Sequence, residues 1–224
     1  MKKVIIACVV MIATVLAGNA QVFVGGGLGF DFEGGKSSYG GTSTDLPKTT
    51  TIGFMPKVGY YLNDDFAIGL EAGFFNSTEK KTSGSQDVKN SLTGWGVGAF
   101  ARYNLVGTDK LSLLLEGAIS VGGMKNKYTY GSTTSNGDPL TTFGIGVLPV
   151  ISYSLTDRLS IEASCDFLRF GFQSVIIKDS EDSKDKETYN HFGLGVNTMG
   201  FNALHLDEYL ELSSMVKIGV IFKF

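Results

Sequence analysis

Residues 95–103 read Trp-Gly-Val-Gly-Ala-Phe-Ala-Arg-Tyr, and their two-residue alternation decides the fold. Successive side chains of an extended strand point to opposite faces. One face therefore carries bulky or methyl-bearing apolar residues: Trp95, Val97, Ala99, Ala101 and Tyr103. The other face is mostly glycine but holds a ring and a charge: Gly96, Gly98, Phe100 and Arg102. This pattern predicts a β-strand between an apolar medium and a crowded interior.

The same alternation recurs along the chain, with little helical periodicity. It predicts eight strands of about the length that crosses a bilayer, at residues 22–32, 52–62, 66–74, 95–103, 111–121, 143–153, 159–167 and 216–224. Their connections alternate in length. Tight turns at 63–65, 106–110 and 156–158 contrast with long polar stretches at 33–49, 77–90, 127–140 and after Phe172. Short turns at one end and long loops at the other are typical of a closed antiparallel transmembrane β-barrel, with periplasmic turns and extracellular loops.

A soluble barrel or sandwich is the competing interpretation. Such a protein directs its bulky face inward and covers the other face with Lys, Glu, Thr and Gln. Here the minor face is mainly Gly, Ala and Ser, which suits the interior of a narrow eight-stranded tube. The pattern therefore favours the membrane.

The first twenty residues have the pattern of a cleaved signal peptide. Lys2 and Lys3 precede an apolar run over residues 4–16, and small residues precede Gln21. The run is shorter than the ~20 residues of a membrane helix. We expect the mature barrel domain to comprise residues 21–224, with Cys165 as its single cysteine and hence no internal disulfide.

The composition argues against nucleic-acid binding. The 19 basic and 22 acidic residues give no basic surplus for nucleic acid, while 30 glycines against 4 prolines indicate systematic use of glycine.

With its signal peptide, its Gly/aromatic strand at 22–30 and its end at 218–224, the chain resembles the small OmpA/OmpX-like porin superfamily of outer-membrane β-barrel proteins. The resemblance covers nearly all of residues 21–224. It implies a fold and a location in the bacterial outer membrane, and no reaction. It also implies that Phe222 and Phe224 form the C-terminal signal that the barrel-assembly machinery recognises.

Seven ionisable residues fall on the inward face: Lys57, Glu71, Arg102, Glu116, Glu162, Asp166 and Lys217. Several lie four to six residues from a short turn, and neighbouring strands alternate in sign. Buried charges persist when they are paired, so we expect an ion-pair ladder that plugs the lumen. Two alternatives are pairs that exchange partners along a path for ions or water, and an acid pair in general acid–base chemistry.

Other candidate sites have weaker patterns. His191 and His205 lie near acidic residues but match no metal-ligand spacing, and Ser213 or Ser214 beside His205 suggests a lipid-modifying enzyme by proximity alone. The glycine runs at 25–27 and 94–98 lack the features of phosphate loops. We expect no catalytic residue, no cofactor and no metal.

The last connection, residues 173–212, has no single interpretation. The eighth strand is interrupted, or a hairpin or helix caps the barrel. A ten-stranded barrel is a further alternative.

Two functions remain. The first is a non-enzymatic structural or surface-interaction role, in which loops such as residues 34–48 meet host molecules or other partners. The second is a narrow porin-like channel for small solutes or ions. Expected partners are outer-membrane lipid and lipopolysaccharide, the barrel-assembly machinery and a surface or host ligand, but no nucleic acid.

Overall fold

The computed structural model describes residues 21–83, 86–165, 168–179, 185–194 and 216–224. Over these ranges the chain is almost entirely β-structure, and no helix in them is long and apolar enough to cross a membrane. Eight strands form the wall of the structure: β1 (Val22–Glu33), β4 (Lys48–Tyr61), β5 (Phe66–Ser83), β6 (Gln86–Gly107), β7 (Leu111–Tyr130), β9 (Leu140–Ser154), β10 (Leu159–Cys165) and β13 (Val216–Lys223). The predicted cleavage at Gln21 concerns residues 1–20, which lie outside the described ranges.

The eight wall strands pair in a ring. Antiparallel pairing runs from β1 through β4, β5, β6, β7, β9 and β10 to β13, and β13 pairs back onto β1. Because each strand has a neighbour on both sides, the ring leaves no sheet edge along its closed part. The predicted all-β, eight-stranded architecture is confirmed.

The bulky face of each strand points outward, as the alternation predicts. Leu70 is 62% exposed and Trp95 is 53% exposed, whereas Arg102 on the opposite face is 2% exposed. A soluble sheet would have the reverse arrangement. Outward aromatic residues also occur near the short-turn ends, where Tyr103 and Tyr153 are about half exposed.

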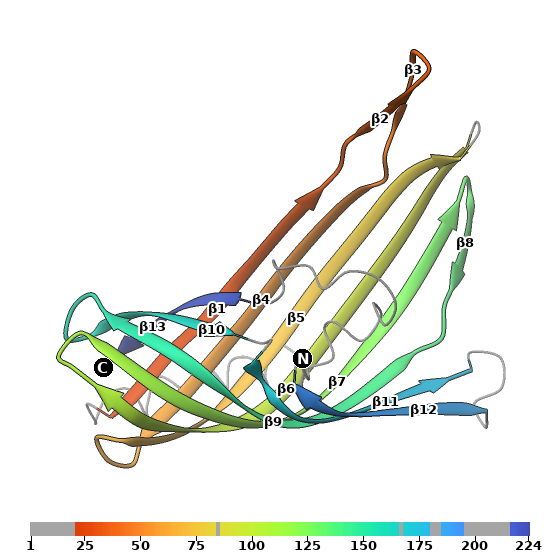
Figure 1. Cartoon of the computed structure of the whole chain (residues 1–224). Helices are drawn as coiled ribbons and strands as arrows, with labels where there is room; N and C mark the ends of the chain where they lie inside the picture. The colour runs from red at the N-terminus through yellow and green to blue at the C-terminus, as the bar shows by residue number, and fades with distance from the viewer. Residues whose placement is uncertain (1–20, 84–85, 166–167, 180–184, 195–215) are drawn as a thin grey trace, which may run out of the picture.

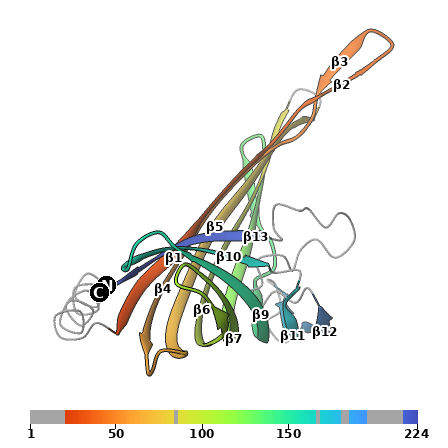
Figure 2. The same cartoon turned by 60° about the vertical axis from the view of Figure 1, so that its left-hand side comes forward.

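Over the residues that the structure describes, the wall is taller on one side than on the other. There β5 has 18 residues and β6 has 22, whereas β10 has 7 and β13 has 8. Figure 1 shows β1 and β4–β7 rising well beyond β10 and β13, with the hairpin β2 (Lys36–Tyr39) and β3 (Thr42–Asp45) at the top. Figure 2 shows the same asymmetry from a second side.

The long connections are more ordered than the sequence predicts. The sequence predicts a loop at 77–90, but β5 and β6 pair through this stretch without a register shift, from Phe66↔Tyr103 to Ser83↔Gln86. The stretch 127–140 likewise contains the end of β7 and β8 (Thr133–Asn136), which pair with each other. Threonine favours strands, and cross-strand hydroxyl bonds stabilise polar pairs, so no apolar alternation is needed there.

The final connection contains a hairpin. β11 (Phe170–Lys178) pairs with β9 beyond the end of β10, and β12 (Lys186–Leu194) pairs with β11. This hairpin extends the sheet sideways from β9 and does not enter the ring. The ring has eight strands, and the ten-stranded alternative is wrong.

Glycines on the inner face make room for aromatic rings. A Cβ atom at Gly59 would overlap the ring of Phe23, and one at Gly69 would overlap the ring of Phe100. Phe23 is fully buried and Phe100 is 4% exposed. The glycine-rich inner face therefore reflects close packing around these two rings.

We predict that Gly59→Ala lowers the free energy of unfolding by about 1–3 kcal/mol, because the new methyl group forces the buried Phe23 ring to move. The measurement is urea unfolding of the refolded protein in detergent micelles. Gly29→Ala is the matched control, since Gly29 is also an inward strand glycine but a methyl group there would meet no atom within 4 Å. Equal stability of the two variants would contradict this packing.

Candidate functional site

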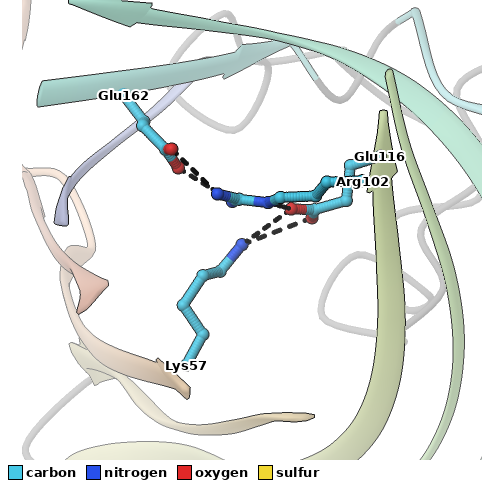
Figure 3. Close-up of polar contacts among 4 residues, drawn as sticks. All are labelled: Lys57, Arg102, Glu116 and Glu162. Carbon is cyan, nitrogen blue, oxygen red and sulfur yellow. Dashed lines mark hydrogen bonds and ion pairs between the residues drawn. The ribbon is translucent and has the colours of Figure 1, made fainter. Parts of the chain in front are cut away.

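Four charged side chains from four strands meet inside the barrel. Lys57 comes from β4, Arg102 from β6, Glu116 from β7 and Glu162 from β10. Arg102 and Glu116 are register partners on adjacent strands, so the backbone pairing of β6 with β7 places them side by side. Lys57 and Glu162 reach them across the lumen, as Figure 3 shows.

Arg102 is the centre of this lumen ion cluster. Its Nη1 and Nη2 donate to Glu162 Oε1 and Oε2, both at 2.8 Å, in a bidentate pair. Its Nε donates to Glu116 Oε2 at 2.5 Å. Lys57 Nζ donates to both oxygens of Glu116, at 3.3 and 3.1 Å. The order Lys57, Glu116, Arg102, Glu162 therefore alternates in charge and links four strands.

Two aromatic rings flank the guanidinium group. Its Cζ atom lies 5.4 Å from the ring centroid of Phe23 and 5.2 Å from that of Phe100. Lys57 Nζ lies 5.0 Å from the Phe100 centroid. These distances fall within the range of cation–π attraction. The rings therefore help to hold the two cations in place.

The cluster is deeply buried, and this burial determines how its ion pairs affect the stability of the fold. The exposed fractions are 2% for Arg102, 4% for Glu116 and 7% for Glu162. Removing charges from water is costly, and pairing with complete hydrogen bonding offsets that cost. The cluster as a whole need not add stability, but loss of one member leaves an uncompensated buried charge.

Apolar residues form two buried clusters inside the barrel. Phe23, Phe100, Ala67, Ala118 and Ile221 pack into one cluster, beside the charges. Toward the long connections, Phe75, Met124 and Leu140 form a second cluster. A cavity of about 70 Å³ is lined in part by Lys57, Glu71, Arg102, Glu116, Glu162 and Arg169. It has room for a few water molecules.

A family model for the outer membrane protein beta-barrel domain matches residues 5–199. The chain belongs to this outer-membrane β-barrel family. Its strands therefore cross the bacterial outer membrane, with short turns in the periplasm and long connections outside.

Solved structures of small barrels are also similar to the chain. Neisserial surface protein A is 16% identical, with 92% of this chain and 98% of that chain covered and a TM-score of 0.40. The attachment invasion locus protein Ail of Yersinia pestis is 13% identical, with 91% and 97% covered and a TM-score of 0.40. A search of curated proteins found no match.

The other three residues of the predicted ion-pair ladder are Glu71, Lys217 and Asp166. Glu71 is the register partner of Lys57 and lines the same cavity, but Lys57 bonds to Glu116 across the lumen. Lys217 lies on β13 opposite Ser164, and its side chain is outside the described set. Asp166 is outside the described ranges.

Two contributors to the site were missed in the sequence. Phe23 precedes the glycine run on the inner face, and its alternation with Val22 and Val24 was a usable signal. Arg169 lines the cavity but comes after the predicted end of the seventh strand, so no periodicity pointed to it.

The remaining candidate residues form no site in the described structure. His191 lies on the exposed strand β12, while His205, Ser213 and Ser214 fall outside the described ranges. Within those ranges, no three His, Cys, Asp or Glu side chains are placed to hold a metal ion. Phe222 on β13 and Phe224 directly after it are partly exposed, and their rings meet edge to face with centroids 5.0 Å apart. Their role in assembly stays a prediction.

We predict that Arg102→Met lowers the free energy of unfolding by about 3–5 kcal/mol, because two carboxylates lose their buried partner. The change can be followed by urea unfolding in detergent micelles, with the fluorescence of Trp95, the one tryptophan, as the signal.

Arg158→Met is the control, since Arg158 is an exposed turn residue and its replacement should change stability by less than about 0.5 kcal/mol. If Arg102→Met were no more destabilising than this control, the cluster would not be a buried, interdependent unit.

Proposed function

We propose that this outer-membrane barrel is a non-enzymatic surface protein, closed to solutes, whose tall strands carry a sheet outside the cell for interaction with other molecules. The observation that carries the proposal is the length of the strands. A tilted strand crosses the bilayer in about 9–11 residues, yet β5 has 18 and β6 has 22. About half of each strand is therefore surplus to membrane crossing.

The side chains on the parts of β5 and β6 beyond the membrane are those of a sheet exposed to water. Beyond Trp95, β6 continues through Thr93, Ser91 and Lys89, and the opposing positions on β5 are Asn76, Thr78 and Lys80. Asn76 Nδ2 donates to Thr93 Oγ1 at 2.9 Å, and the hydroxyl groups of Thr78 and Ser91 lie 3.3 Å apart. Such cross-strand pairs stabilise the solvated part of the sheet. An ordered, polar platform suits recognition better than a flexible loop.

The lumen supports the non-conducting part of the proposal. The ion cluster spans the tube from β4 to β10, and the buried rings of Phe23 and Phe100 pack against its guanidinium group. An ion that crosses this barrel must break a bidentate pair and pass between buried aromatic rings. We therefore assign the cluster the role of a structural plug.

A narrow channel is the second candidate function. The cavity of about 70 Å³ beside six charged side chains favours it, since water there could join exchangeable pairs. Measurement of conductance separates the two functions.

We predict that the refolded protein shows no stepwise conductance in planar bilayers at high KCl concentration. Phe23→Ala combined with Phe100→Ala should produce openings, because it removes the two rings that flank Arg102. A heat-dependent gel shift would show that the variant still folds. Steps in the wild-type protein that change size with Lys57→Gln would establish the channel instead.

The surface role can be tested at the β2–β3 hairpin, which projects furthest from the ring (Figure 1). Replacement of residues 36–45 by a short Gly-Ser link should reduce the retention of intact cells on fibronectin, collagen or plastic surfaces, while the heat-dependent gel shift persists. A peptide tag inserted between Gly40 and Gly41 should be labelled by antibody on intact cells. Equal retention with and without the hairpin, and with and without the protein, would argue against a surface-interaction role.

A further inference from the structure

Two aromatic rings remain exposed on the tall part of the sheet, beyond the membrane. Tyr128 and Tyr130 lie on β7, five and seven residues after Gly123, which is the register partner of Trp95. Five residues of a strand span roughly 17 Å, so both rings lie well above the level of the interfacial tryptophan. Tyr128 is 46% exposed and Tyr130 is 53% exposed. The rings therefore meet water on the tall side of the barrel (Figure 1).

Both rings lie on the inner face of the sheet, which continues the lumen wall. Tyr128 and Tyr130 are four and six residues from Met124, a buried member of the second apolar cluster. An even spacing keeps side chains on one face of a strand. The Tyr128 ring leans over Gly137, where an added Cβ atom would lie 3.0 Å from ring atom Cε2. The Gly137 amide donates to the carbonyl of Asn126 at 2.9 Å, so this support for the ring is fixed by the sheet.

Hydrogen-bond acceptors lie in the same row as Tyr128. Asn90 of β6 is the register partner of Tyr128, and Glu79 of β5 is the register partner of Asn90. On the other side, Tyr128 pairs with Ser135 of β8. The Oδ1 atom of Asn90 is buried and has no hydrogen-bond partner among the described residues. A buried acceptor without a donor is costly, so a ligand that donates to this atom gains binding free energy.

The inner face of β5 to β8 is close to neutral beyond the membrane. Its charged side chains are Glu79 and Lys81, whose Oε1 and Nζ atoms lie 3.8 Å apart. The other lysines on these parts of the strands stand an odd number of residues from the Tyr128 row and so point to the opposite face: Lys80, Lys89, Lys125 and Lys127. The face that carries the tyrosines therefore offers no excess of positive charge to an anion.

We propose that this face binds an uncharged glycan, an inference that rests on the surface-interaction role proposed above. We call the binding residues the tyrosine site: Glu79, Asn90, Tyr128, Tyr130 and Ser135. The C–H groups on one side of a sugar ring pack against the electron-rich face of an aromatic ring. Sugar hydroxyl groups donate to Asn90 Oδ1 and to the carboxylate of Glu79.

The chemistry of the site distinguishes a glycan from other ligands. A proline-rich peptide also stacks on tyrosine rings, but proline has no N–H group to donate to the acceptors. A sulfated or sialylated chain brings negative charge to a face whose carboxylate, Glu79, repels it. An uncharged chain with many hydroxyl groups satisfies both the rings and the acceptors.

The position of the site favours a glycan carried by another surface. The head groups of the surrounding outer leaflet meet the outer face of the wall, whereas the tyrosine site is on the inner face. Its rings also lie well above the membrane interface. A chain that approaches from outside the cell reaches them without crossing the lipid layer.

The test measures binding of the full barrel, refolded in a detergent without a sugar head group, to a printed array. The probes are uncharged oligosaccharides of galactose, glucose and mannose, together with their sulfated and sialylated counterparts. The first variant combines Tyr128→Leu with Tyr130→Leu. The matched control combines Tyr103→Leu with Tyr153→Leu, because these tyrosines are 49% and 44% exposed but lie near the short-turn ends. The heat-dependent gel shift shows that each variant is folded.

The second variant, Asn90→Leu, separates a binding role from a structural one. Replacement of an acceptor that has no partner by an apolar side chain of similar size should leave the urea midpoint unchanged. Glycan binding should nevertheless weaken by about fivefold or more, because the ligand loses a hydrogen bond.

We expect the wild-type protein to bind uncharged probes, the double tyrosine variant to bind them at least about tenfold more weakly, and the control to change less than about twofold. Salt at about 1 M, which shortens the screening length to about 3 Å, should leave this binding unchanged. Absence of binding to every uncharged probe, or equal binding by the double variant and its control, would overturn the proposal. Tighter binding of sulfated probes that is lost at high salt would identify a polyanion and also overturn it.

Failure of this proposal is distinguishable from failure of the surface role. If no uncharged glycan binds but cells still need the β2–β3 hairpin for retention, the tyrosine site alone is refuted. If retention is also independent of the protein, the surface role is refuted as well.

Discussion

The contact on which the lumen depends is the bidentate pair between Arg102 and Glu162. It joins β6 to β10 across the tube, while Arg102 also binds Glu116 on the adjacent strand. Because Arg102 is almost fully buried, its charge must be matched within the barrel. Lys57 then matches the second charge of the carboxylate pair, so the four-residue cluster contains two cations and two anions.

The membrane imposes the rest of the arrangement. With lipid outside, the apolar residues of each strand point outward, and all backbone groups need partners within the sheet. An eight-stranded tube is narrow enough for side chains from opposite walls to meet. Glycines such as Gly59 and Gly69 leave space for the rings of Phe23 and Phe100, and the rings in turn enclose Arg102. Above the membrane the same strands continue with polar side chains.

The sequence predicts the strands within the bilayer well because alternation there is forced by lipid on one side and crowding on the other. It predicts the inward direction of Lys57, Arg102, Glu116 and Glu162 for the same reason. It does not predict their partners, because alternation fixes only the face of each side chain, and a lysine side chain is long enough to reach Glu116 across the lumen. It also underestimates β5 and β6, because outside the membrane both faces are polar and the period of two disappears. The hairpin of β11 and β12 was one of several open interpretations, since its pairing with β9 is a contact between segments distant in sequence.

The most direct test of the plug is a double-mutant cycle between Arg102 and Glu162, with unfolding free energies from urea titration in detergent micelles. Arg102→Met, Glu162→Gln and the double variant are compared with the wild-type protein. A buried bidentate pair predicts a coupling free energy of about 2–3 kcal/mol, so that the double variant is more stable than the sum of the single changes implies. A coupling of about zero, within the ~0.5 kcal/mol expected of independent sites, would mean that the two side chains do not meet in the folded barrel and would contradict a lumen closed by this cluster.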